Sequence, residues 1–201
     1  PILLRWGGAA LALGLLMSLV ALNSDLLRSA GFQFPRREPS DRMRGWKSTA
    51  GGVEKIRAEV EGRLAERVFM IADQRDRASE LAFYFRDQRL EGPGHPPVYI
   101  IESQDIQNQF SFWPRYDEFV EAPADATRSE GDVYTEESGI NPFAGRTAIY
   151  IQASGKTDVP RNIGEAFAST ELYATIEVRR HGKLLRTLQV FVCKKYRTLP
   201  L

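Results

Sequence analysis

A run of five apolar residues at positions 68–72 is the most clearly patterned stretch of the chain, and a helical pattern follows it directly. An uninterrupted apolar run of this length is typical of a strand that is buried on both faces of a sheet. Asp73 ends the run with a side chain that can cap a helix. Beyond it, apolar residues recur at the spacing of one helical face, at Ala78, Leu81, Ala82 and Phe85. A buried strand that leads straight into a helix is the first half of a βαβ unit.

Further patterns on both sides extend this unit. An amphipathic helix is predicted at residues 46–66, because apolar residues recur there every three or four positions, at Val53, Ile56, Val60 and Leu64. Short apolar runs predict two more strands, at residues 98–101 and 147–153, and a short helix with a proline at its start is predicted at residues 160–167. Residues 121–146 are rich in Ala, Pro, Gly and acids, which predicts a long surface loop.

The C-terminal part of the chain predicts an antiparallel hairpin. Apolar and polar residues alternate at residues 172–178 and again at 184–193, and His181-Gly182 between the two runs suits a two-residue turn. Together these elements predict an α/β fold: a three-layer domain with a mixed, mainly parallel sheet that is closed by this hairpin.

Residues 6–22 carry no charge, and they predict a transmembrane helix within residues 1–27. Roughly 17 helical residues span about 26 Å, slightly less than the ~30 Å hydrocarbon core of a bilayer. A signal peptide and a buried core helix are the alternatives. Residues 28–45 are rich in Arg and Lys, and we interpret them as a juxtamembrane linker that rests on lipid headgroups or is simply solvated.

Residues 46–201 would then form a soluble domain outside the cytoplasm, tethered to a bacterial inner membrane. The basic linker alone would favour a cytoplasmic domain, but long domains cross membranes largely regardless of such charges. The 201-residue chain has a net charge of +1, so nothing in its overall charge favours a nucleic-acid partner. Its single cysteine, Cys193, excludes an internal disulfide.

The motifs of common catalytic and cofactor sites are incomplete. Residues 154–157, SGKT, resemble part of a phosphate-binding loop, but Tyr150 stands where that motif requires glycine. His95 and His181 have no companions at ligand spacing, so neither a metal nor nucleophilic catalysis is predicted. No cofactor is expected. A soluble hydrolase would also lack a nucleophile–base pair.

The most unusual local composition lies at residues 104–113, where amides alternate with aromatic side chains. Planar amides next to aromatic faces suit sugars, and α/β folds place ligands beyond strand ends, where Asp73 and Glu102 are expected. The predicted ligand-binding residues are therefore Asp73, Asn108, Gln109 and Trp113. The alternatives are that Asp73 only caps a helix, that Glu102 is solvated, and that the aromatic residues anchor a loop onto the sheet.

Several of these segments, in this order, resemble the C-terminal part of bacterial membrane glycosyltransferases that use polyprenyl-phosphate sugars. This family includes the protein O-mannosyltransferase-like and aminoarabinose-transferase-like enzymes. The most specific segments are ASELAFY at residues 78–84 and NQFSFW at residues 108–113. The resemblance implies an enzyme that moves a sugar from a polyprenyl-phosphate donor to an envelope acceptor: a glycan, a lipid or a protein.

In that family the catalytic acid lies in an early extracytoplasmic loop, and no such region is present in this sequence. The resemblance therefore implies that this segment has no catalytic residue and serves as an accessory or acceptor-binding domain. The alternative is a stand-alone binding module that is tethered to the membrane of the cell envelope. The sequence identifies neither the sugar nor the acceptor.

Overall fold

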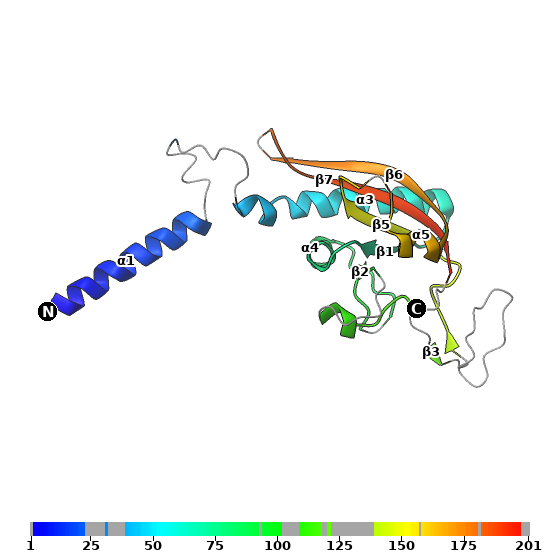
Figure 1. Cartoon of the computed structure of the whole chain (residues 1–201), viewed down its shortest axis with the longest axis horizontal. Helices are drawn as coiled ribbons and strands as arrows, with labels where there is room; N and C mark the ends of the chain where they lie inside the picture. The colour runs from blue at the N-terminus through cyan, green and yellow to red at the C-terminus, as the bar shows by residue number, and fades with distance from the viewer. Residues whose placement is uncertain are drawn as a thin grey trace. The chain divides into compact units, whose positions relative to one another are not determined.

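A computed structural model of the chain describes residues 2–22, 31, 39–92, 94–101, 109–117, 120–121, 139–156, 158–180 and 182–197. The chain divides into two compact units, Pro1–Arg44 and Gly45–Leu201. The first unit contains helix α1 (Ile2–Leu22) and the short 3-10 helix η1 (Pro39–Met43). The second unit contains the sheet and its covering helices (Figure 1).

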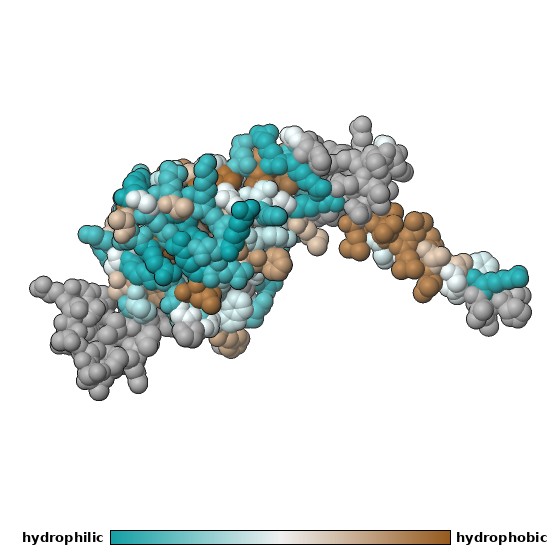
Figure 2. Space-filling model, turned by 180° about the vertical axis from the view of Figure 1, so that it is seen from behind, coloured by the Kyte–Doolittle hydropathy of each residue, from teal (hydrophilic) through white to brown (hydrophobic). Residues whose placement is uncertain are grey.

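Helix α1 differs from the expectation for residues 1–27. Its side chains are mostly apolar and exposed, as the brown surface in Figure 2 shows. However, no helix within the described part of the chain is both long and apolar enough to cross a membrane. The prediction of a transmembrane helix is therefore wrong. The uncharged run of this helix begins only after Arg5.

The second unit is built on a mixed five-stranded sheet with the order β2-β1-β5-β7-β6. Its strands are β1 (Phe69–Ala72), β2 (Tyr99–Ile100), β5 (Ala148–Ala153), β6 (Phe167–Arg180) and β7 (Lys183–Tyr196). Strand β1 lies parallel to both β2 and β5, whereas β7 lies antiparallel to both β5 and β6. A separate antiparallel pair is formed by β3 (Val120–Glu121) and β4 (Gly139–Ile140).

The α/β architecture, the parallel pairing of β1 with β2 and the C-terminal hairpin all agree with the sequence patterns. The expectation of a mainly parallel sheet is wrong. The two strands of the hairpin have 14 residues each, while the parallel strands have between two and six. Because β7 pairs with β5 as well as with β6, antiparallel pairing predominates along most of the sheet.

Each face of the sheet has its own core. Helices α3 (Trp46–Leu64) and α4 (Arg75–Tyr84) pack on one face, which presents Met70, Ala72, Ile149, Ile151, Leu188, Val190 and Val192. The short helix α5 (Arg161–Ala166) packs on the other face, over an aromatic core that includes Phe69, Tyr99, Tyr116, Phe143 and Tyr196. The alternation of side chains along each strand explains why neighbouring residues belong to different cores.

The aromatic core also corrects the prediction of a surface loop over residues 121–146. In the described end of this segment Asn141 and Phe143 are almost completely buried, although Pro142 and Gly145 are exposed. The Asn141 side-chain amide donates a hydrogen bond to the carbonyl of Tyr116 (3.0 Å), and its Oδ1 accepts one from the Phe143 N–H (2.8 Å). An apolar ring and a buried amide therefore fasten this segment to the sheet.

The start of α3 is held against the hairpin. Gly45, the residue before the helix, has a left-handed backbone with φ of 79°. A Cβ atom at this position would lie 3.0 Å from methyl groups of both Leu185 and Val178. The Arg186 guanidinium lies over the Trp46 ring, 3.7 Å from its centroid. Because Gly45 has no side chain, the helix start can approach the hairpin this closely.

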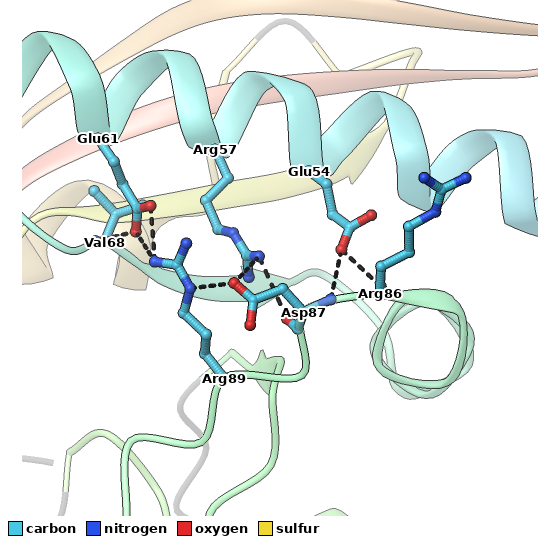
Figure 3. Close-up of polar contacts among 7 residues, drawn as sticks. All are labelled: Glu54, Arg57, Glu61, Val68, Arg86, Asp87 and Arg89. Carbon is cyan, nitrogen blue, oxygen red and sulfur yellow. Dashed lines mark hydrogen bonds and ion pairs between the residues drawn. The ribbon is translucent and has the colours of Figure 1, made fainter.

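An ionic network joins α3 to the segment that follows α4 (Figure 3). The Glu54 carboxylate accepts hydrogen bonds from the backbone N–H groups of Arg86 (2.7 Å) and Asp87 (3.1 Å). The Glu61 carboxylate accepts from Arg89 at 2.8 and 2.9 Å and from the Val68 N–H at 3.1 Å. This network fixes the chain that leads toward β2, and so it positions the edge where the candidate site lies.

Strand β6 forms the long outer edge of the sheet, since no described strand pairs with its other side. Its register against β7 shifts at two places, between Leu172 and Ala174 and again between Val178 and Arg179. Charged side chains occur along the same strand, at Glu171, Glu177, Arg179 and Arg180. Irregular pairing and charge are the features by which edge strands avoid pairing with other chains.

Candidate ligand-binding site

A small hollow, about 20 Å³ in volume, lies beside the edge strand β2 and the 3-10 helix η2 (Gln109–Phe112). The side chains that line it come from β2, from the chain just before and after that strand, and from the turn after η2: Pro96, Tyr99, Ile100, Ile101, Ser111, Pro114, Arg115 and Tyr116. The hollow therefore borders β2, an edge strand of the sheet, and Asp73 at the end of β1 does not line it.

Two aromatic side chains next to the hollow are exposed. Phe112 is 73% exposed and Trp113 is 42% exposed, and they lie between Ser111 and Pro114, which both line the hollow. The interpretation of these two residues as anchors buried against the sheet is therefore not supported. Large exposed aromatic side chains next to a concave surface are typical of binding sites.

The buried wall of the hollow is aromatic and held in place by hydrogen bonds. The Tyr99 and Tyr116 rings meet edge to face, with their centroids 5.7 Å apart. The Tyr99 hydroxyl is hydrogen-bonded to Nδ1 of His95 at 2.8 Å. His95 thus has a structural partner in the described chain, and its role is to orient Tyr99.

The charged group at the rim is already paired. The Nε of Arg115 donates to Oδ1 of Asp117 at 2.8 Å, and a second guanidinium nitrogen contacts Oδ2 of the same carboxylate. Asp117 is largely buried, with 10% of its side chain exposed. A two-point contact of this kind holds the plane of the guanidinium in a fixed orientation.

Of the four predicted ligand-binding residues, the structure places two near the hollow. Gln109 begins η2 and is exposed, and Trp113 directly follows η2, although neither lines the hollow itself. Asn108, and also Glu102, lie outside the described residues. Asp73 is at the end of β1, where its carboxylate contacts Arg77 and accepts a hydrogen bond from the Ala153 N–H at 3.2 Å.

Asp73 therefore fastens β1 to β5. The chain leaves β1 toward α4 on one face of the sheet and leaves β5 toward α5 on the other, so this is a topological switch point. In this domain the Asp73–Arg77 ion pair occupies the switch point. Burial lowers the pKa of the Arg77 guanidinium. The contacts favour a structural role for Asp73, because both its oxygens serve the fold, but not the helix-capping role, since Gln74 precedes α4 and no side chain caps that helix.

The site residues that sequence reasoning missed are Tyr99, Ser111, Arg115 and Tyr116. Tyr99 stands inside an apolar run and is indistinguishable from a core residue in the sequence. Arg115 and Asp117 are two positions apart, a spacing that predicts a pair in an extended segment, and this signal was present. Among the residues that the structure describes, no group of His, Cys, Asp and Glu side chains could hold a metal ion.

Comparison with known proteins adds no relative: no family model, no curated protein and no solved structure matches the chain.

Proposed function

We propose that residues 45–201 form a non-catalytic carbohydrate-binding domain that serves a glycosyltransferase acting on polyprenyl-phosphate sugars. The observation that carries this proposal is the pair of exposed aromatic side chains, Phe112 and Trp113, next to a hollow with an aromatic wall. The C–H face of a sugar ring packs on such aromatic side chains, while its hydroxyl groups need donors and acceptors at the rim. Ser111 and the Arg115–Asp117 pair supply both.

The chemistry of the site supports binding rather than turnover. The hollow presents one ionisable pair, and its carboxylate, Asp117, is engaged by Arg115 through both oxygens. A general base must be able to take up a proton within reach of a bound substrate, and a carboxylate held in this way is poorly suited to that task. The resemblance to the glycosyltransferases supplies the larger reaction, with its catalytic acid outside this sequence.

A binding experiment with matched variants tests the proposal. The full 201-residue chain is titrated with a panel of oligosaccharides, and binding is followed by saturation-transfer NMR. Phe112→Ala and Trp113→Ala should each weaken saccharide binding by about tenfold, the loss expected when one stacking surface is removed. Phe83→Ala is the matched control, because Phe83 is 74% exposed, lies on α4 and does not line the hollow.

Thermal unfolding separates this role from a structural one. Both site variants should unfold within a few degrees of the wild-type chain, because the side chains that they remove are exposed. Equal loss of binding in the Phe83→Ala control, or no saccharide binding by the wild-type chain, contradicts the proposal. Transfer of sugar from a polyprenyl-phosphate donor by this chain alone contradicts the statement that it is non-catalytic.

A further inference from the structure

The charged side chains at the rim of the hollow indicate which class of ligand the site can bind. Among the described residues that line the hollow, Arg115 is the only one with a formal charge. A lone arginine at such a place would favour a phosphate, because its fork of N–H groups matches phosphate oxygens. In this domain the N–H groups of the Arg115 guanidinium point toward Asp117 and contact both of its carboxylate oxygens. The pair has no net charge.

A phosphate at this rim would meet two obstacles. It would have to displace a carboxylate from a two-point contact, and the displaced Asp117 would remain largely buried without its cation. If the pair stayed intact, the phosphate would lie close to a second negative charge. Neither obstacle exists for a sugar hydroxyl, since it can donate to the carboxylate and accept from the guanidinium at the same time.

The other charges of this region are also matched. Arg146 contacts the Phe143 ring, 5.1 Å from its centroid, and Phe143 belongs to the same aromatic core as Tyr99. The Arg146 guanidinium forms an ion pair with Glu91 at 2.9 Å. The described neighbourhood of the hollow therefore offers an aromatic and aliphatic surface with balanced charge.

From this geometry we infer that the exposed aromatic surface beside the hollow binds the uncharged part of a saccharide and excludes its phosphate. The inference rests on the proposed function and specifies which part of a lipid-linked sugar or a glycan acceptor the domain recognises. The aromatic side chains select a sugar ring, and the neutral Arg115–Asp117 pair selects hydroxyl groups over phosphate. Binding to this site should depend little on salt, because no net charge is neutralised.

The test compares each sugar with its own phosphate. The full chain is titrated with mannose, glucose and N-acetylglucosamine and, in parallel, with the 1-phosphate of each. The neutral sugars should bind at least as tightly as the phosphates, and their affinity should change by less than about twofold between low and high salt, since screening acts on charges. Phe112→Ala must weaken this binding for it to be assigned to the hollow.

Asp117→Asn provides a matched change of specificity. It removes the negative charge and leaves the shape of the side chain, so the contact with the Arg115 guanidinium is weakened and an anion at the rim no longer meets a carboxylate. The variant should bind the sugar 1-phosphates at least about fivefold more tightly than the wild-type chain does, and this gain should disappear at high salt. The wild-type comparison remains decisive if the variant folds poorly.

The possible outcomes separate the two proposals. If the wild-type chain binds the phosphates several-fold more tightly than the neutral sugars, with a steep salt dependence and sensitivity to Phe112→Ala, the hollow is a sugar-phosphate site. The inference about ligand class is then wrong while the binding domain stands. If no sugar of either kind binds, both proposals fail. If saccharide binding is unchanged in Phe112→Ala, the ligand binds elsewhere on the chain, and both proposals are wrong.

Discussion

Substituting Gly45 by alanine should destabilise the second unit by about 2 kcal/mol. Gly45 has φ of 79°, and a left-handed backbone costs a residue with a Cβ roughly 1–2 kcal/mol. The new methyl group would also lie 3.0 Å from methyl groups of Leu185 and Val178, so the hairpin would have to move by a few tenths of an ångström. Crowding of this kind in a packed core adds about 1 kcal/mol or more.

The assay is urea unfolding followed by circular dichroism, with Gly51→Ala as the matched control. Gly51 lies in the same helix, is exposed, and has open space where a Cβ would be added. Alanine there should stabilise the helix by about 0.5–1 kcal/mol, because it restricts the unfolded chain and favours the helix. With a urea slope of about 2 kcal/mol/M, the midpoints of the two variants should move apart by more than about 1 M. Equal midpoints, or a stabilised Gly45→Ala, would refute the reasoning.

Three further predictions concern buried polar groups. Burial raises the pKa of the Cys193 thiol from 9.0 to about 12, so the unfolded chain loses this proton first, and stability falls as pH rises from about 9 to about 12. Between pH 9 and 10 the wild-type chain should lose about 1 kcal/mol more unfolding free energy than Cys193→Ala, and parallel pH curves would contradict this. Glu61→Gln should cost about 1–2 kcal/mol in urea unfolding, because it weakens the contacts to Arg89 and to the Val68 N–H; an unchanged midpoint would show that the network adds nothing. The Tyr150 hydroxyl is buried without a hydrogen-bond partner in the described chain, so Tyr150→Phe should raise the melting temperature or leave it unchanged, and a clear loss of stability would reveal a partner for that hydroxyl.

The backbone of the fold could be predicted from local patterns. The apolar run before Asp73, the helical spacing that follows it and the alternating C-terminal runs each predicted the right type of element. What the patterns could not provide was pairing at long range. The contact of β7 with β5 depends on which hydrophobic faces meet after folding, so the extent of antiparallel pairing was underestimated.

The predictions for the N-terminal helix and for the segment around Phe143 differ from the structure for different reasons. Hydropathy predicted a spanning helix from an uncharged run slightly shorter than a bilayer core, and no described helix is both long and apolar enough to cross a membrane. For Phe143, a composition of glycine, proline and acids suggested a loop. A single aromatic residue and one amide, Asn141, were enough to bury its end.

The site residues stay a prediction, although Trp113 lies next to the hollow. A carboxylate after a strand looks the same in sequence whether it binds a ligand or fastens two strands, and the contacts of Asp73 favour the second role. Arg115 and Asp117 matter through their mutual geometry, which no pattern of apolar and polar positions records.

The irregular outer strand has a consequence for how many copies of this domain can share a small volume. A neighbouring chain that approached β6 would meet a strand whose register is irregular at two places and which carries charged side chains. The opposite edge, β2, is only two residues long. Both described edges of the five-stranded sheet therefore disfavour the addition of a strand from another copy.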